Sequence, residues 1–229
     1  MSTSHVLDLE NQMKLVWSPE MASKAYIDTV KICKKVKESD HVELISAMAG
    51  GWSPKLIIEA WSSGSNITTS IGLDIAARHL GTRYVCMVQN ESARLEYETA
   101  VKDHGSPVPE LVVGEAKEVM ARLQEVEFMV VDGRRNDLYE LFGLARLSRR
   151  GAVLLCTNAN QRCMVRFRWD SVVGDKSRVE RSVSMPVGRG LNIAYIKCNR
   201  ESGNSSLRKR NRWITRIDQK TGEEHVFRG

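Results

Sequence analysis

A group of small polar residues directly follows an apolar run in the first third of the chain. The run 55–61 is largely apolar, and the loop 62–66 behind it consists only of Ser, Gly and Asn. A strand that ends in a tight loop is expected from this pattern. Over 67–80 apolar residues recur at helical spacing, and Gly81 is a typical residue just beyond a helix. The unpaired N–H groups at the start of that helix favour a polar or anionic part of a ligand.

A second apolar run, 84–88, follows this helix and ends in Gln89, Asn90 and Glu91. A strand, a crossover helix and a parallel strand form a right-handed unit, in which both strands end at the same edge of the sheet. Ligands bind at that edge, so the sequence predicts a nucleotide-type binding unit. A nicotinamide-dependent reductase is a weaker alternative, because the loop lacks the GxGxxG pattern and has Gly64 as its only glycine.

The spacing of the other reactive residues does not support further constellations. His41, His79, His104 and His225 are neither spaced like metal ligands nor placed beside a nucleophile. The five cysteines are scattered and lie mostly in apolar runs. We therefore expect buried free thiols rather than disulfides or a zinc site.

Alternating apolar runs and helical patterns must position the polar residues. We expect helices over 19–35, 40–48, 92–102, 116–123 and 137–149, and strands over 111–113, 128–131, 153–156, 179–185 and 191–197. A loop with Pro and Gly joins the last two strands, as in an antiparallel pair. This order predicts an α/β fold, a doubly wound and mostly parallel sheet with an antiparallel C-terminal strand pair.

Length and composition bound the organisation of the chain. Its 229 residues suffice for one domain with appended segments. We expect a flexible N-terminal tail over 1–13, a domain over 14–199 and a basic C-terminal extension over 200–229, in which 213–217 and 224–227 form a hairpin. The sequence has neither an apolar run of about 18 residues nor the apolar centre of a secretory signal, so we expect a cytoplasmic or nuclear protein.

Most of the net charge of +6 lies in the C-terminal extension, which holds eight Lys and Arg residues against four acids. A basic segment of this kind can bind nucleic acid or another anionic surface by neutralising phosphates. The alternative is a solvated extension that aids solubility.

Four segments carry a resemblance to a known family, namely 59–64, 130–139, 156–158 and 185–191. Their order resembles that of class I S-adenosylmethionine-dependent methyltransferases, and the most similar named group is the catechol and caffeoyl-coenzyme A O-methyltransferases. This resemblance covers roughly residues 40–197. Nearly the whole chain from Met13 onward also resembles a plant family of uncharacterised proteins with the same expected fold. The resemblance implies a Rossmann-like methyltransferase fold with S-adenosylmethionine as its cofactor.

Position by position, the resemblance implies a set of cofactor-binding residues. Glu59 and Gly64 would lie at the methionine end of the ligand, where Glu59 pairs with the ammonium group. The ribose position, usually an acid in the family, is Gln89, whose amide binds a diol without a charge-assisted component. The whole set is Glu59, Trp61, Ser62, Ser63, Gly64, Ser65, Gln89, Glu91, Gly114, Glu115 and Asp132. The alternatives are a backbone cap for Glu59 and an ordinary first-turn acid of a helix for Glu115.

The resemblance also bears on catalysis. The similar enzymes bind magnesium with two aspartates and an asparagine, and a lysine takes the proton of the acceptor. This chain keeps Asp132 and Asn158, but Thr157 replaces the second aspartate and Arg135 the lysine. Magnesium needs hard oxygen ligands and arginine is too basic to accept a proton, so we do not expect the metal-dependent mechanism. Asp132 would instead contact ligand or substrate, and Arg135 would bind an anionic substrate group. The alternatives are a turn cap and a surface arginine.

Two hypotheses of different classes follow. In the first, the protein is a methyltransferase that positions a small-molecule or RNA acceptor in line with the sulfonium methyl group, so that proximity supplies most of the acceleration. In the second, an inactive methyltransferase fold acts as a binding or regulatory module, with RNA contacted through the basic extension. Labelled methyl transfer separates the two.

Overall fold

The computed structural model describes residues 17–36, 41–159, 167–173, 177–198, 213–217 and 224–228. The chain divides into two compact units, 1–199 and 200–229. The expected N-terminal tail over 1–13 and the first part of the C-terminal extension, 200–212, lie outside the described residues. In the described ranges, no helix has the length and hydrophobicity that crossing a membrane requires.

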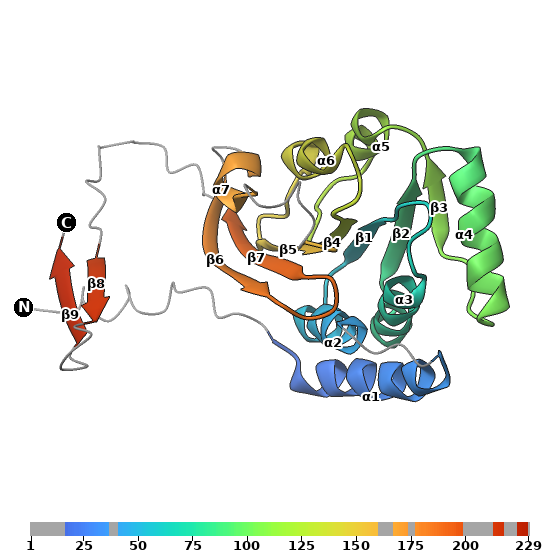
Figure 1. The fold of residues 1–229 in the computed structure, drawn as a ribbon, viewed down its shortest axis with the longest axis horizontal. Coiled ribbons are helices and arrows are strands. Elements are labelled where there is room, and N and C mark those ends of the chain that lie inside the picture. Colours follow the sequence, from blue (N-terminus) through green and yellow to red (C-terminus); the bar gives the residue numbers. More distant parts are fainter. Residues whose placement is uncertain are drawn as a thin grey trace, which may run out of the picture. The chain divides into compact units, whose positions relative to one another are not determined.

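The larger unit is built on one sheet (Figure 1). Its strands are β1 Leu56–Ala60, β2 Arg83–Val88, β3 Glu110–Val113, β4 Phe128–Asp132, β5 Ala152–Thr157, β6 Ser177–Met185 and β7 Leu191–Cys198. They lie in the order β3-β2-β1-β4-β5-β7-β6. The first five strands pair in parallel, whereas β7 is antiparallel to both β5 and β6. The predicted doubly wound sheet with an antiparallel C-terminal pair is therefore confirmed.

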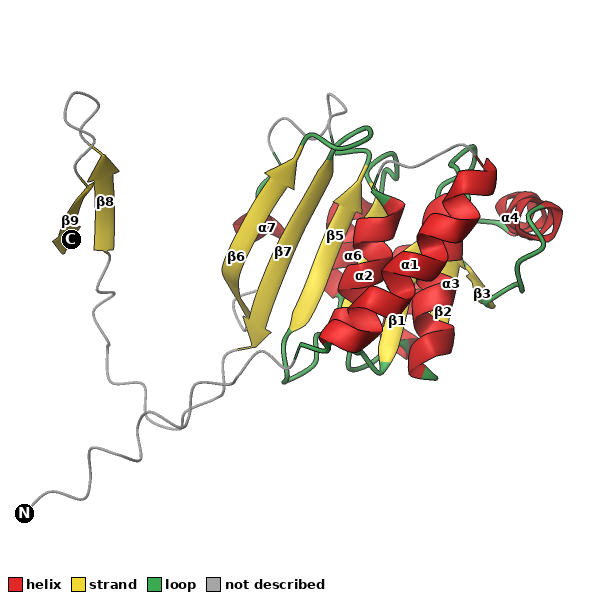
Figure 2. Ribbon diagram, turned by 90° about the horizontal axis from the view of Figure 1, so that it is seen from below, coloured by secondary structure: helices red, strands yellow, loops and turns green. Residues whose placement is uncertain are grey.

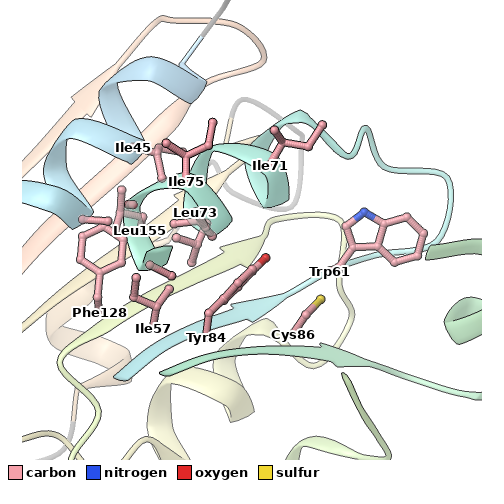
Figure 3. Packing of buried hydrophobic residues seen from close by; sticks show 14 of the residues in the cluster. Ile45, Ile57, Trp61, Ile71, Leu73, Ile75, Tyr84, Cys86, Phe128 and Leu155 are labelled. Carbon is pink, nitrogen blue, oxygen red and sulfur yellow. The ribbon is translucent and has the colours of Figure 1, made fainter. Parts of the chain in front are cut away.

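Helices cover both faces of this sheet. They are α1 Pro19–Val36, α2 Val42–Trp52, α3 Thr68–Leu80, α4 Glu91–Asp103, α5 Ala116–Arg122, α6 Leu138–Leu144 and α7 Trp169–Val172. Figure 2 shows α1, α2 and α3 over one face, and Figure 1 shows α5 and α6 over the other. Successive strand residues point to opposite faces, so Ile57 packs toward α2 and α3 (Figure 3) while Ile58 packs toward α5 and α6. Apolar cores on both faces of the sheet therefore fix the position of the carboxyl ends of its parallel strands.

The helix predicted over 40–48 continues to Trp52 and includes two glycines. A Cβ atom at Gly50 would lie 2.6 Å from the carbonyl oxygen of Met21, and one at Gly51 would lie 2.3 Å from the ring of Trp17. Glycine is a poor helix former, but here it lets α1 approach α2 closely. Tertiary packing thus extends the helix beyond the end that the local sequence predicts.

We expect Gly50→Ala to lower the free energy of unfolding by about 1 to 3 kcal/mol, because the added methyl group overlaps a backbone atom. The matched control is Gly143→Ala in α6, where the Cβ would meet only the Val172 carbonyl oxygen at 3.6 Å. That control should gain up to about 1 kcal/mol from helix propensity. Urea denaturation measures both, and equal effects would contradict the close helix approach.

The helix predicted over 137–149 ends at Leu144 instead. The following residues pair with the chain before β4, where the Val126 N–H donates to the Arg146 carbonyl oxygen at 2.9 Å and the Ser148 N–H donates to the Val126 carbonyl oxygen at 3.0 Å. Extended pairing thus satisfies backbone groups that a longer helix would have used.

The structure describes the side chains of three cysteines, Cys33, Cys86 and Cys156, and all three are buried, as predicted. Burial raises the pKa of Cys86 well above its usual value, so this thiol is unreactive. The side chains of Cys163 and Cys198 lie outside the described residues.

In the smaller unit, β8 Trp213–Ile217 pairs antiparallel with β9 Glu224–Arg228. The two strands form a separate two-stranded sheet.

Candidate functional site

A cavity of about 400 Å³ lies at the edge where β1, β4 and β5 end. Its walls come from these strand ends, the loop after β1, the starts of α2 and α3, and the loop between β6 and β7. The charged and strongly polar side chains among its lining residues include Glu59, Ser65, Asp132, Arg134, Asn158 and Arg189. The cavity therefore lies at the carboxyl edge, where an open α/β sheet binds its ligands.

Glu59 is a buried acid in the cavity wall, with 4% of its surface exposed. Its Oε1 accepts a hydrogen bond from the Ser70 hydroxyl at 2.9 Å, and its Oε2 accepts one from the Tyr84 hydroxyl. Burial raises the pKa of Glu59 to about 7, although both hydrogen bonds act to lower it. Within the described part of the chain no cation is hydrogen-bonded to this carboxyl group. The carboxyl group of Glu59 therefore lies in the cavity wall without a cation bonded to it in the described ranges.

Asp132, at the end of β4, is engaged at both carboxylate oxygens. Oδ1 accepts from the Arg134 backbone N–H at 2.9 Å and from the Asn158 amide at 2.8 Å, while Oδ2 accepts from the Ser65 hydroxyl. The Arg134 guanidinium pairs with Oδ2 at 3.2 Å. It also donates to Ser65 and, at 3.2 Å, to the Gly64 carbonyl oxygen. Arg134 therefore ties the loop after β1 to the end of β4.

Gly133 brings the turn after β4 against the end of β5. Its N–H donates to the Thr157 carbonyl oxygen at 2.8 Å, and a Cβ atom at this position would lie 2.7 Å from the same oxygen. This approach requires glycine, and it places Asp132 beside Asn158.

An acid of α4 holds the loop after β1 from the side. The Gly64 N–H donates to Glu96 Oε1 at 2.7 Å, and the Ser63 hydroxyl donates to Oε2. Inside the loop, the Ser65 N–H donates to the Ser62 carbonyl oxygen at 2.9 Å. Ser62 and Ser63 do not line the cavity, so they shape the loop rather than the cavity wall.

Arg135 does not line the cavity, and its side chain is 0% exposed. Nη1 donates to the Trp61 carbonyl oxygen at 3.0 Å, while Nε and Nη2 donate to the Asp137 carboxylate at 2.8 and 2.6 Å. This placement matches neither a substrate-binding group nor a surface arginine. It favours a structural role, and Arg134 is instead the member of this pair that reaches the cavity.

The residues predicted to bind the nucleoside part lie at the same sheet edge but outside the cavity. Gln89 is exposed after β2, and Glu91 pairs with Arg94 at 2.5 Å. Gly114 and Glu115 follow β3, and Glu115 is exposed. Of the predicted set, the cavity is lined by Glu59, Trp61, Gly64, Ser65 and Asp132.

Sequence reasoning did not assign Arg134 and Arg189 to the site. The only signal for Arg134 was an arginine pair just after a strand end, and the signal for Arg189 was its position within the segment 185–191. Both line the cavity.

The donor set around Asp132 does not fit a magnesium ion. Magnesium takes oxygen ligands, often carboxylates. Both Asp132 oxygens are engaged by N–H and O–H donors, and Asn158 directs its NH₂ group toward them. In the described ranges no three His, Cys, Asp or Glu side chains are grouped as metal ligands. The Arg134 guanidinium supplies positive charge at this place.

Known structures share this fold. A methyltransferase from Geobacter sulfurreducens matches with a TM-score of 0.50 and 16% identity, over 85% of this chain and 97% of its own. The SAH-bound methyltransferase PaMTH1 from Podospora anserina matches with a TM-score of 0.51 and 14% identity, over 87% and 98%. Cofactor-bound Rv0187 from MTB matches with a TM-score of 0.50 and 16% identity, over 87% and 100%. No curated protein sequence matches the chain.

The sheet order, the helices on both faces and these similar structures define a Rossmann-like methyltransferase fold. The resemblance to methyltransferases that the sequence carries is confirmed at the level of the fold. The chain itself belongs to the family described as "Protein of unknown function (DUF1442)", whose model matches residues 13–229.

Proposed function

We propose that this protein binds S-adenosylmethionine at the carboxyl edge of its sheet and transfers the methyl group to a small-molecule acceptor. The observation that carries the proposal is Glu59, a buried acid in the cavity wall with a pKa of about 7 and no cation bonded to it among the described residues. A buried charge is costly until a partner neutralises it. The ammonium group of the cofactor is such a partner.

The remaining residues fit the amino-acid end of the cofactor. Gly64 and Ser65 form the loop wall beside Glu59. At the start of α3, Thr68 and Thr69 supply hydroxyl donors for a carboxylate, whereas the Thr68 backbone N–H already donates to Asn66 Oδ1 at 2.9 Å. The nucleoside end then extends along the sheet edge toward Gln89, outside the cavity. The cofactor supplies an activated methyl group, so the task of the protein is chiefly to position the acceptor.

Calorimetric titration with S-adenosylmethionine and S-adenosylhomocysteine tests the proposal. Glu59→Gln removes the charge-assisted pairing and should weaken binding about 10- to 100-fold. Wild-type affinity should fall about tenfold between pH 7.5 and pH 6, because an acid of pKa about 7 becomes protonated, whereas the variant should show no such fall.

Glu110→Gln is the control, since this acid lies on β3 outside the cavity and pairs with Arg83 of β2 at 2.6 Å. It should bind both ligands like the wild type. Folded protein that gives no heat and no thermal stabilisation with either ligand would contradict cofactor binding.

The second candidate is a binding module that has lost transfer, and the basic extension favours it, with eight Lys and Arg residues against four acids. Cofactor binding without labelled methyl transfer to any small acid, phenol or RNA would favour this module. Transfer to RNA that is lost at high salt would instead extend the acceptor class.

A further inference from the structure

Two arginines reach the cavity from different elements. Arg134 follows β4, whereas Arg189 lies in the loop between β6 and β7. That loop is held at the end of β5, because the Ala159 N–H donates to the Gly190 carbonyl oxygen at 2.9 Å. Arg134 is paired with Asp132, but Arg189 is exposed and has no acidic partner in the described part of the chain. Arg189 is thus a cation available to a ligand.

The charges of the cavity point to an anionic acceptor. The cavity wall carries two acids, Glu59 and Asp132, and two arginines, Arg134 and Arg189. These charges balance. S-Adenosylmethionine brings an ammonium, a sulfonium and a carboxylate group, and therefore adds one net positive charge. An acceptor with one negative charge restores neutrality, and a guanidinium binds a carboxylate in a bidentate geometry.

Three ionisable groups of the site are unsuited to take a proton from an acceptor. Asp132 accepts hydrogen bonds at both oxygens, Arg135 is buried elsewhere, and Glu59 faces the ammonium group in the proposed complex. His41 also lines the cavity, and histidine is a residue type that can take up a proton. A carboxylic acid needs no base, because it is already ionised at neutral pH.

We infer that the acceptor is a small carboxylic acid, bound by Arg189 beside Arg134 and methylated on its carboxylate oxygen. The inference rests on the proposed function. A lone pair of the carboxylate oxygen attacks the methyl carbon, the carbon–sulfur bond breaks, and its electron pair stays on sulfur. The products are a neutral methyl ester and a neutral thioether, and no proton moves.

The test uses the full chain saturated with S-adenosylhomocysteine. Benzoate, cinnamate and indole-3-acetate are each compared with the corresponding amide by thermal shift. A parallel assay with methyl-labelled S-adenosylmethionine measures label that alkali releases as methanol, which is the signature of a methyl ester. At least one acid should stabilise the complex and accept alkali-labile label, whereas its amide should do neither.

Arg189→Gln should weaken binding of that acid about tenfold or more, since a charge-assisted pair is lost. Its affinity for S-adenosylhomocysteine should stay within about twofold of the wild type. Arg181→Gln on β6, an exposed arginine outside the cavity, is the matched control and should leave acid binding unchanged.

The outcomes separate the two proposals. If S-adenosylhomocysteine itself does not bind, the proposed function fails before any acid is added. If S-adenosylhomocysteine binds but no acid is bound or methylated, the carboxylate inference is overturned. Label that is stable to alkali, or transfer only to phenols that His41→Ala abolishes, overturns it as well.

Discussion

Between pH 5 and pH 8, the ligand-free wild-type protein should lose about 2 kcal/mol of unfolding free energy relative to Glu59→Gln. The cause is the buried carboxyl group of Glu59, whose pKa is raised from 4.5 to about 7 by burial. Below about pH 4.5 this group is protonated in both the folded and the unfolded chain. As the pH rises toward 7, the unfolded chain releases a proton that the folded chain retains, so the free energy of unfolding falls. Above about pH 7 the carboxyl group is ionised in both states, and the free energy of unfolding is lowered by the full cost of the buried charge.

Urea denaturation of both proteins at pH 5 and pH 8 measures this effect. The difference between wild type and variant cancels the contributions of other carboxyl groups to the pH dependence. Such groups include Asp74, whose pKa is raised by burial, and Glu110, whose pKa is lowered by its hydrogen bond with Arg83. Gln keeps one acceptor oxygen for one of the two hydroxyl groups of Ser70 and Tyr84, and its NH₂ group can donate to the other, so the fold should survive the change. Parallel pH dependence of the two proteins would show that Glu59 is not buried as an acid.

Arg135→Leu should lower the free energy of unfolding by about 3 kcal/mol or more, because it leaves partly buried Asp137 and the Trp61 carbonyl oxygen without their donors. Arg178→Leu is the control, since this arginine is 67% exposed and lies 3.8 Å from the exposed Glu180. Its substitution should cost about 1 kcal/mol or less. Chemical denaturation of the two variants gives the comparison.

This experiment also decides between the two roles considered for Arg135. A stable Arg135→Leu variant that has lost substrate binding would support the role that the family resemblance implies. A destabilised variant would support the structural role that its contacts with Asp137 and Trp61 indicate.

The sequence predicts the fold well because its strands are separate apolar runs. The end points of helices were less predictable where contacts distant in sequence decide them. The local sequence predicts a helix that stops at residue 48, but α2 continues through Gly50, whose lack of a side chain admits the backbone of Met21. Likewise, the helix that begins at Leu138 ends early because Val126 pairs with the residues that follow it. Neither contact leaves a local signal.

The site was predictable where a residue type and a strand end coincide. Glu59 and Asp132 both meet that condition, and both line the cavity. Arg134 and Arg135 are adjacent and chemically identical, so only the turn geometry after β4 decides which one faces the cavity. That turn is set by Gly133 against Thr157, a contact across strands that the sequence alone does not reveal.

Glu96 holds the loop after β1 by hydrogen bonds, and this contact determines which sequence features distant relatives of the chain should share. A loop whose path depends on its own glycines leaves a compact signature in the sequence. Here the loop is fixed by hydrogen bonds from Ser63 and Gly64 to one acid 32 residues beyond Gly64. The other small residues of the loop can then be substituted during evolution, while the hydrogen bond from the Gly64 N–H to the acid preserves the backbone path of the loop. Relatives of this chain should be recognisable by an acid 32 residues beyond the position of Gly64, even where the loop has no glycine-rich motif.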